Sequence, residues 1–157
     1  ALTNLPTSLY ENIIAGQRNI SMVKNDMHKV LYESEAAIVT SGTATLETAI
    51  TGTPQIVVYK GNYFSYHIAK WLIKVPYISL VNLVAGKELV PELIQKECNA
   101  SRMQSSLLKI LEPDNYKRIQ QGYLELQQLL ISGGGPDAAA KDILSDLNSM
   151  KKSNGQK

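Results

Sequence analysis

The 157-residue sequence has little of what disulfide-rich, metal-binding or membrane-spanning proteins need. Its only cysteine, Cys98, excludes an internal disulfide framework and a cysteine-rich zinc site, and two histidines leave little for a histidine metal site. No apolar run approaches the roughly 20 residues of a membrane-spanning helix. Sixteen basic and 14 acidic residues give a net charge of +2, so no strong field attracts nucleic acid. We expect a reducing, cytoplasmic compartment and no nucleic-acid partner.

The composition, 44% apolar and 19% charged, is that of a globular domain. Short apolar runs predict strands at 20–23, 36–40, 55–59 and 77–81. Helical periods predict a helix after Pro6, a helix after an N-cap at Asn25, and further helices or helical turns at 43–51, 63–74, 91–97, 100–111, 116–131 and 137–150. Strands that alternate with helices over short links predict an α/β fold with a Rossmann-like, doubly wound parallel sheet.

The most informative segment is AAIVTSGTATLETAITGTP, from Ala36 to Pro54. A buried strand ending at Thr40 runs into Ser41 and Gly42, where glycine permits a tight turn and a close ligand. The next helix begins with small residues, and its first amides have no partner within the helix. These amides point out of the carboxyl edge of the sheet, where open α/β folds bind ligands, so phosphate is the expected guest. An ordinary helix cap is the alternative.

Glu47 lies about one turn inside the same helix. A carboxylate at this place can accept hydrogen bonds from the vicinal hydroxyls of a ribose, so the segment suits a nucleoside diphosphate. The alternative is a solvated surface charge. The segment is neither a P-loop nor a dinucleotide fingerprint, because the lysine and the further glycines are absent.

The block from Ser41 to Glu47, with Gly52-Thr53-Pro54 and a strand ending in Tyr59-Lys60, resembles the nucleotide-binding domain of lipid-A-disaccharide synthase. A second block, NLVAGKELVPEL from residue 82 to 93, resembles the same family, and the similarity extends over nearly the whole chain. The resemblance implies the C-terminal half of a GT-B glycosyltransferase, a fold of two Rossmann-like domains that face each other across a cleft.

The same resemblance implies a reaction of lipid A biosynthesis. The family transfers 2,3-diacylglucosamine from UDP to 2,3-diacylglucosamine 1-phosphate and releases UDP. The family's catalytic carboxylate lies in an N-terminal domain that this chain does not contain, and the first strand and loop of the nucleotide domain are absent too. We therefore expect no catalytic residue in this chain, which reads as a fragment that binds UDP weakly and does not turn over by itself.

By this comparison, seven residues are implied to bind UDP: Ser41, Gly42, Thr43, Ala44 and Thr45 at the phosphates, Glu47 at the ribose, and Asn82 from the second block. Tyr59 and Lys60 are candidate substrate contacts, and Lys60 stands where the family often has arginine. No Asp-x-Asp pair that would hold a divalent ion is present, so we expect no cofactor and metal-independent transfer, with helix amides neutralising the diphosphate.

The predicted helix at 63–74 is basic and aromatic. Its residues Phe64, Lys70, Trp71 and Lys74 are candidates for peripheral contact with the cytoplasmic face of the bacterial inner membrane, since the family's substrates are acylated. The alternative is that its apolar side chains simply pack on the sheet.

We divide the chain into a Rossmann-like nucleotide-sugar-binding domain at 1–112, C-terminal helices at 113–150 and a disordered tail at 151–157. The apolar stripes of the C-terminal helices need a surface to cover, so they are expected to pack on a partner domain, cross to it, or pair in a homodimer.

Two other classes of function stay open on the residues alone. One is another UDP-sugar enzyme, such as a 2-epimerase or a peptidoglycan glycosyltransferase. The other is a non-catalytic module that uses the helix N-terminus to bind some other anion. The NLVAGKEL block and the basic aromatic helix favour the lipid enzyme.

Overall fold

The computed structural model describes residues 6–61 and 76–132, and its centre is a three-stranded parallel sheet with the order β1-β2-β3. The strands are Ala37–Thr40 (β1), Gln55–Tyr59 (β2) and Glu92–Ile94 (β3). Val57 in the central strand pairs with Val39 on one side and Glu92 on the other. The α/β class with a parallel sheet is therefore confirmed.

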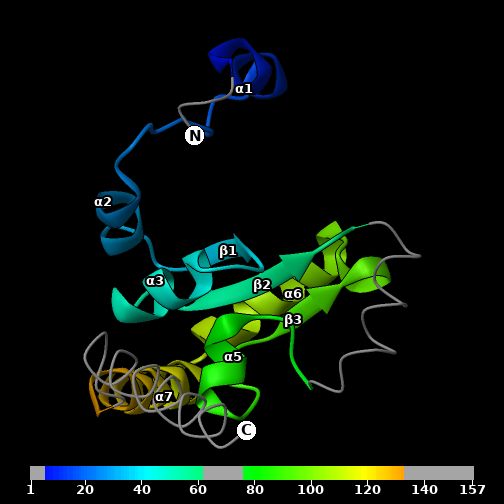
Figure 1. The fold of residues 1–157 in the computed structure, drawn as a ribbon. Helices are drawn as coiled ribbons and strands as arrows, with labels where there is room; N and C mark the ends of the chain where they lie inside the picture. The colour runs from blue at the N-terminus through cyan, green and yellow to red at the C-terminus, as the bar shows by residue number, and fades with distance from the viewer. Residues whose placement is uncertain (1–5, 62–75, 133–157) are drawn as a thin grey trace, which may run out of the picture.

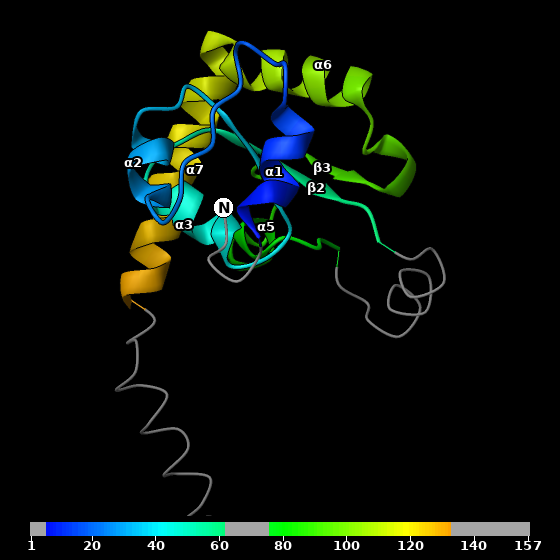
Figure 2. The same ribbon diagram turned by 90° about the horizontal axis from the view of Figure 1, so that it is seen from above.

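Helices cover both faces of this sheet (Figures 1 and 2). Helix α6 (Ala100–Leu111) packs against β2 on one face, and α3 (Ala44–Ile50) and α5 (Leu80–Ala85) lie on the other. The long helix α7 (Pro113–Ser132) contacts α3, α5 and α6. It passes the amino edge of the sheet, because Gln120 donates to the Gly52 carbonyl just before β2 at 2.6 Å. The opposite, carboxyl edge is the one that carries Gly42.

The core lies between the sheet and these helices. The central strand is buried on both faces, as its continuous apolar run predicts. The fully or nearly fully buried apolar side chains come from six elements and the segment before β3: Ala49, Ile56, Val57, Val81, Leu89, Val90, Leu93, Ile110, Ile119, Tyr123 and Leu126. Burial of these side chains holds the sheet and the helices together, and this packing sets the position of the carboxyl edge of the sheet.

Several helix ends follow the expected local chemistry. Helix α3 is followed by Gly52 at φ +82° and then by Pro54, as predicted. Helix α6 has the predicted bounds, and the Asn99 side chain accepts a hydrogen bond from the Arg102 amide at 3.1 Å. Helix α7 begins three residues earlier than the predicted 116, because Pro113 suits a first helical position.

The N-terminal part differs from the prediction. Residues 20–23 form no strand, since a strand needs a neighbour and the only described ladder partner of β1 is β2. Helix α2 (Met27–Tyr32) has Asp26, not Asn25, at its N-cap. Asn25 takes a left-handed turn conformation instead, at φ +56°. Helix α1 (Thr7–Ile14) buries no residue and stands apart from the sheet in Figure 1.

The prediction of a strand at 77–81 is also wrong, and the predicted helical turn at 91–97 is confirmed only in its last part, at 95–97. Ser79 is the N-cap of α5, and its hydroxyl accepts a hydrogen bond from the Asn82 amide. The third strand is Glu92–Ile94, followed by a 3₁₀ helix, η1 (Gln95–Glu97). The amides of Ile78 and Ser79 donate to the Glu92 side chain, so they are not free for a strand ladder.

Other predictions lie outside the described residues. They are the helices at 63–74 and 137–150 and the tail at 151–157. The domain boundary at residue 112 stays a prediction. In the part of the chain that the structure describes, no helix is both long and apolar enough to span a membrane.

Candidate functional site

The turn after β1 opens at the carboxyl edge of the sheet. Gly42 has φ +155°, a conformation that residues other than glycine rarely adopt, and a Cβ built on it would meet no atom of residues 6–61 and 76–132 within 4 Å. The space beside this backbone is therefore open. Within residues 6–61 and 76–132, the amides of Gly42, Thr43 and Ala44 donate to no protein acceptor. Three adjacent N–H groups are thus available to an anion.

The hydroxyl groups of this segment play different parts. Ser41 donates to the Ile78 carbonyl at 2.7 Å, and the fully buried Thr45 donates to the Gly42 carbonyl at 2.8 Å. Both hydroxyl hydrogens are therefore used within the protein, and these two residues shape the turn. Thr43 is exposed, and its hydroxyl has no partner in the described parts of the chain. It is the hydroxyl that remains for a ligand.

Glu47 is the fourth residue of α3, about one turn inside the helix, as predicted. Its side chain is half-buried, and its carboxylate has no hydrogen-bond or ion-pair partner among the described residues. Both carboxylate oxygens can therefore accept hydrogen bonds from the hydroxyls of a ligand.

A buried polar cluster, formed by Gln55 and Tyr123, makes hydrogen bonds to the first turn of α3 and to the chain just before β2. The Gln55 amide, at the start of β2, donates to the Thr45 carbonyl at 2.9 Å and to the Tyr123 hydroxyl at 3.2 Å. Tyr123 donates in turn to the Thr53 carbonyl at 3.3 Å. Burial raises the pKa of the Tyr123 hydroxyl, outweighing the hydrogen bonds from Gln55, so it stays a neutral donor. This cluster could not be predicted from the sequence, where its one local signal is a glutamine that opens an apolar strand.

Asn82, predicted to bind UDP, is fully buried and lies in α5 rather than after a strand. Its amide nitrogen donates to the Val90 carbonyl and to Glu92, both at 2.9 Å. Its oxygen accepts from the amides of Leu89 and Val90 at 2.9 and 3.0 Å. Every hydrogen-bonding position of the side chain is filled, so Asn82 organises the segment before β3 and presents no group to a ligand here.

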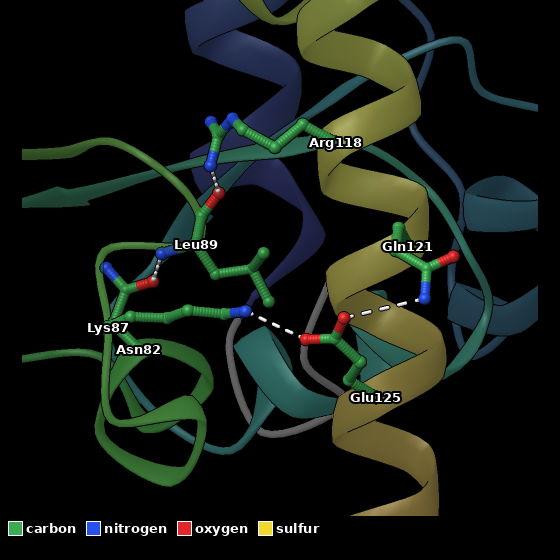
Figure 3. Close-up of polar contacts among 6 residues, drawn as sticks. All are labelled: Asn82, Lys87, Leu89, Arg118, Gln121 and Glu125. Atoms are coloured by element: carbon green, nitrogen blue, oxygen red, sulfur yellow. Dashed lines mark hydrogen bonds and ion pairs between the residues drawn. The ribbon is translucent and has the colours of Figure 1, made fainter.

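Helix α7 holds the same segment from outside (Figure 3). Lys87 pairs with Glu125 at 2.8 Å, and Arg118 donates to the Leu89 carbonyl at 3.4 Å. The hydrogen bond from Lys87 is the largest cause that lowers the pKa of Glu125, followed by the hydrogen bond from Gln121. This pair is exposed, so its role is to orient side chains at the rim of the segment.

The ends of the other two strands lie at the same edge as Gly42. Tyr59, half-buried, ends β2, and Lys60 beside it is exposed, where a ligand can reach it. Gln95 follows β3 at φ +52°, and its side-chain nitrogen is buried without a hydrogen-bond partner among the described residues. The sequence gives no sign of this strained backbone. The predicted membrane contacts Phe64, Lys70, Trp71 and Lys74 lie outside the described residues.

No group of three or more His, Cys, Asp or Glu side chains in the described ranges is placed to hold a metal ion. The metal-independence of the reaction stays a prediction, since this observation does not test it.

Fold and turn together define an α/β protein with a candidate anion site at the carboxyl edge of its sheet. Comparison with known proteins makes the assignment specific: the chain belongs to the lipid-A-disaccharide synthetase family, whose model matches residues 9–134. The match includes Gly42, Glu47 and the segment from Asn82 to Glu92. The predicted family resemblance is confirmed.

Individual relatives agree. The chain is 44% identical over 135 residues to the lipid-A-disaccharide synthase of Syntrophus aciditrophicus. This alignment covers 85% of this chain and 34% of that protein. It is 36% identical over 130 residues to the synthase of Sulfurihydrogenibium sp., and this alignment covers 83% of this chain and 34% of that protein. It is 35% identical over 151 residues to the synthase of Persephonella marina, and this alignment covers 90% of this chain and 40% of that protein. The chain thus spans about a third of the length of the first two relatives.

Proposed function

We propose that this chain supplies the UDP-binding part of a lipid-A-disaccharide synthase, as the C-terminal half of a GT-B fold. The whole enzyme would transfer 2,3-diacylglucosamine from UDP to 2,3-diacylglucosamine 1-phosphate. The observation that carries the proposal is the family match across residues 9–134. The open turn at Gly42, within the matched range, supports the place of the nucleotide.

In this proposal the turn stabilises the leaving group. As the bond between the sugar and UDP breaks, negative charge grows on the diphosphate. The unpartnered amides of Gly42, Thr43 and Ala44 would donate to its oxygens. Helix α3 has only seven residues, so these individual hydrogen bonds carry the stabilisation more than a long helix dipole would.

Ribose and sugar would lie on either side of the diphosphate. The unpartnered carboxylate of Glu47 would accept hydrogen bonds from the ribose hydroxyls. Tyr59 and Lys60, at the end of the neighbouring strand, would lie toward the transferred sugar. Ser41 and Thr45 would hold the turn rather than donate to phosphate, since their hydroxyl hydrogens are used.

The remaining chemistry would come from outside this chain. The acceptor hydroxyl attacks the anomeric carbon, UDP departs, and a carboxylate expected in the N-terminal domain takes the proton. This chain alone would therefore bind UDP weakly without turnover. We also propose metal-independent transfer, peripheral contact with the cytoplasmic face of the inner membrane, and a homodimer through the C-terminal helices. Transfer by the whole enzyme should persist in EDTA.

A titration tests the proposal. UDP, UMP and inorganic phosphate are added separately to the protein, and binding is followed by calorimetry. We expect UDP to bind more tightly than UMP, and phosphate least, because only UDP offers both a diphosphate and a ribose. Equal binding of UDP and phosphate would favour a generic anion module, and conversion of a UDP-sugar without an acceptor would favour an epimerase.

A further inference from the structure

We propose that Glu92 is a positioning residue for the candidate nucleotide site, acting through Ile78 on Ser41. The inference rests on the proposed UDP-binding function. The structure places Glu92 at the first position of β3, beside Val57 of the central strand.

The Glu92 carboxylate accepts four hydrogen bonds from the segment that begins α5. One oxygen, Oε2, accepts from the Ile78 amide at 2.9 Å. The other, Oε1, accepts from the Ser79 amide at 3.0 Å, the Ser79 hydroxyl at 2.5 Å and the Asn82 side chain at 2.9 Å. The carboxylate therefore takes the place of a backbone acceptor for two consecutive amides at the start of a helix.

The same segment is bonded to the candidate site. The Ile78 carbonyl accepts the Ser41 hydroxyl at 2.7 Å, while the Ser41 amide donates to the Val58 carbonyl at 3.2 Å. Ser41 is thus fixed between the central strand and Ile78, and the next residue is Gly42, with its open amide. The hydrogen bonds from Glu92 to the turn meet at one residue, Ile78, whose amide donates to Glu92 and whose carbonyl accepts the Ser41 hydroxyl.

Glutamine at this position would break the line at one point. Its single oxygen would stay with the three donors that now meet Oε1, and its NH₂ group would face the Ile78 amide, so that two donors oppose each other. Glu92→Gln should therefore release Ile78 while keeping the size of the side chain. Ser41→Ala removes the hydrogen bond to the carbonyl of the same residue, Ile78.

A double-mutant cycle for UDP binding, in the whole protein that contains this chain, tests the inference. Calorimetry gives the Kd of the wild type, Glu92→Gln, Ser41→Ala and the double variant. We expect each single change to raise the Kd about tenfold, the size of one lost hydrogen bond, and the double variant to add little more, because both act through Ile78. Glu88→Gln is the matched control, since Glu88 is exposed nearby and has no described partner; its Kd should be unchanged.

Thermal unfolding separates positioning from a loss of fold. A Glu92→Gln protein that melts earlier but binds UDP with the wild-type Kd would overturn the proposal, and so would additive effects in the cycle. Glu92→Asp, which keeps two acceptor oxygens on a shorter chain, should give an intermediate Kd, and it replaces Glu92→Gln in the cycle if that variant does not fold. If the wild type binds phosphate as tightly as UDP, the proposed function fails, and the same cycle with inorganic phosphate as the probe decides the role of Glu92.

Discussion

Gly122 of α7 lies so close to Leu89 that a Cβ on the glycine would overlap the leucine Cδ1 atom. Both residues are buried, and Leu89 belongs to the segment that Asn82 organises. Helix α7 can therefore pack this closely against the segment before β3 because residue 122 has no side chain.

We expect Gly122→Ala to destabilise the protein. Overpacking costs about 1–3 kcal/mol, and the higher helix propensity of alanine, about 1 kcal/mol, offsets only part of it. Chemical denaturation of the whole protein measures the change. Gln128→Ala, on the exposed side of the same helix, should have little effect. A Gly122→Ala protein at least as stable as the wild type would contradict the close packing.

The parts of the fold that sequence predicts are those that local patterns decide. The run Ile56-Val57-Val58 marks a buried strand by composition alone, and helix α3 is bounded by small residues at one end and Gly52 at the other. These signals depend on neighbours a few residues away, so they survive without knowledge of the tertiary structure.

Where the structure differs, distant partners decide. Residues 77–81 look like a strand, but Ser79 binds a carboxylate 13 residues away and begins a helix. Asn82 looks like a polar residue at a sheet edge, yet its side chain is filled by the segment before β3. The Gln55–Tyr123 contact joins residues 68 positions apart, and no local pattern reveals it.

In the candidate site, too, local patterns could be predicted from the sequence and contacts with distant residues could not. The place of Gly42 and Glu47 could be predicted, because a strand, a glycine and a helix follow one another directly. That Ser41 and Thr45 use their hydroxyls within the protein could not, since Ser41 finds its acceptor at Ile78.

Gly42→Ala should weaken UDP binding about tenfold. Open space surrounds the new Cβ, so no clash occurs, but φ +155° is strained for alanine and the turn amides should move. Calorimetry measures the Kd. Gly86→Ala is a matched control. Gly86 also has a positive φ, +65°, and no described atom within 4 Å of an added Cβ, but it lies at the C-terminal end of α5, away from the turn. It should lose about 1 kcal/mol of stability and keep its UDP affinity. Equal losses of affinity in both variants would refute a special role for the turn.

The Lys87–Glu125 pair should show itself in the pKa of Glu125. The hydrogen bond from Lys87 favours the charged carboxylate, so the folded-state pKa lies below the ordinary value for glutamate. The pair therefore stabilises the fold above the ordinary glutamate pKa, and this contribution is lost as the pH falls through the folded-state pKa. NMR titration of the wild type and Lys87→Met measures it. We expect the pKa to rise in the variant, and an unchanged value would mean that Lys87 does not contact Glu125 in solution.

Glu47→Gln tests the contact with ribose most directly. A hydrogen bond to a charged group contributes about 1.5–3 kcal/mol, so we expect the Kd for UDP to rise by a factor of about ten to a hundred. The loss should nearly vanish when 2′,3′-dideoxy-UDP is the ligand, because that nucleotide has no hydroxyl for the carboxylate to accept. Glu88→Gln, also an exchange of one charge, should leave the Kd of both nucleotides as in the wild type. If Glu47→Gln weakens both nucleotides equally, the carboxylate acts on the turn rather than on the ribose, since only a direct contact can depend on the ligand's hydroxyls.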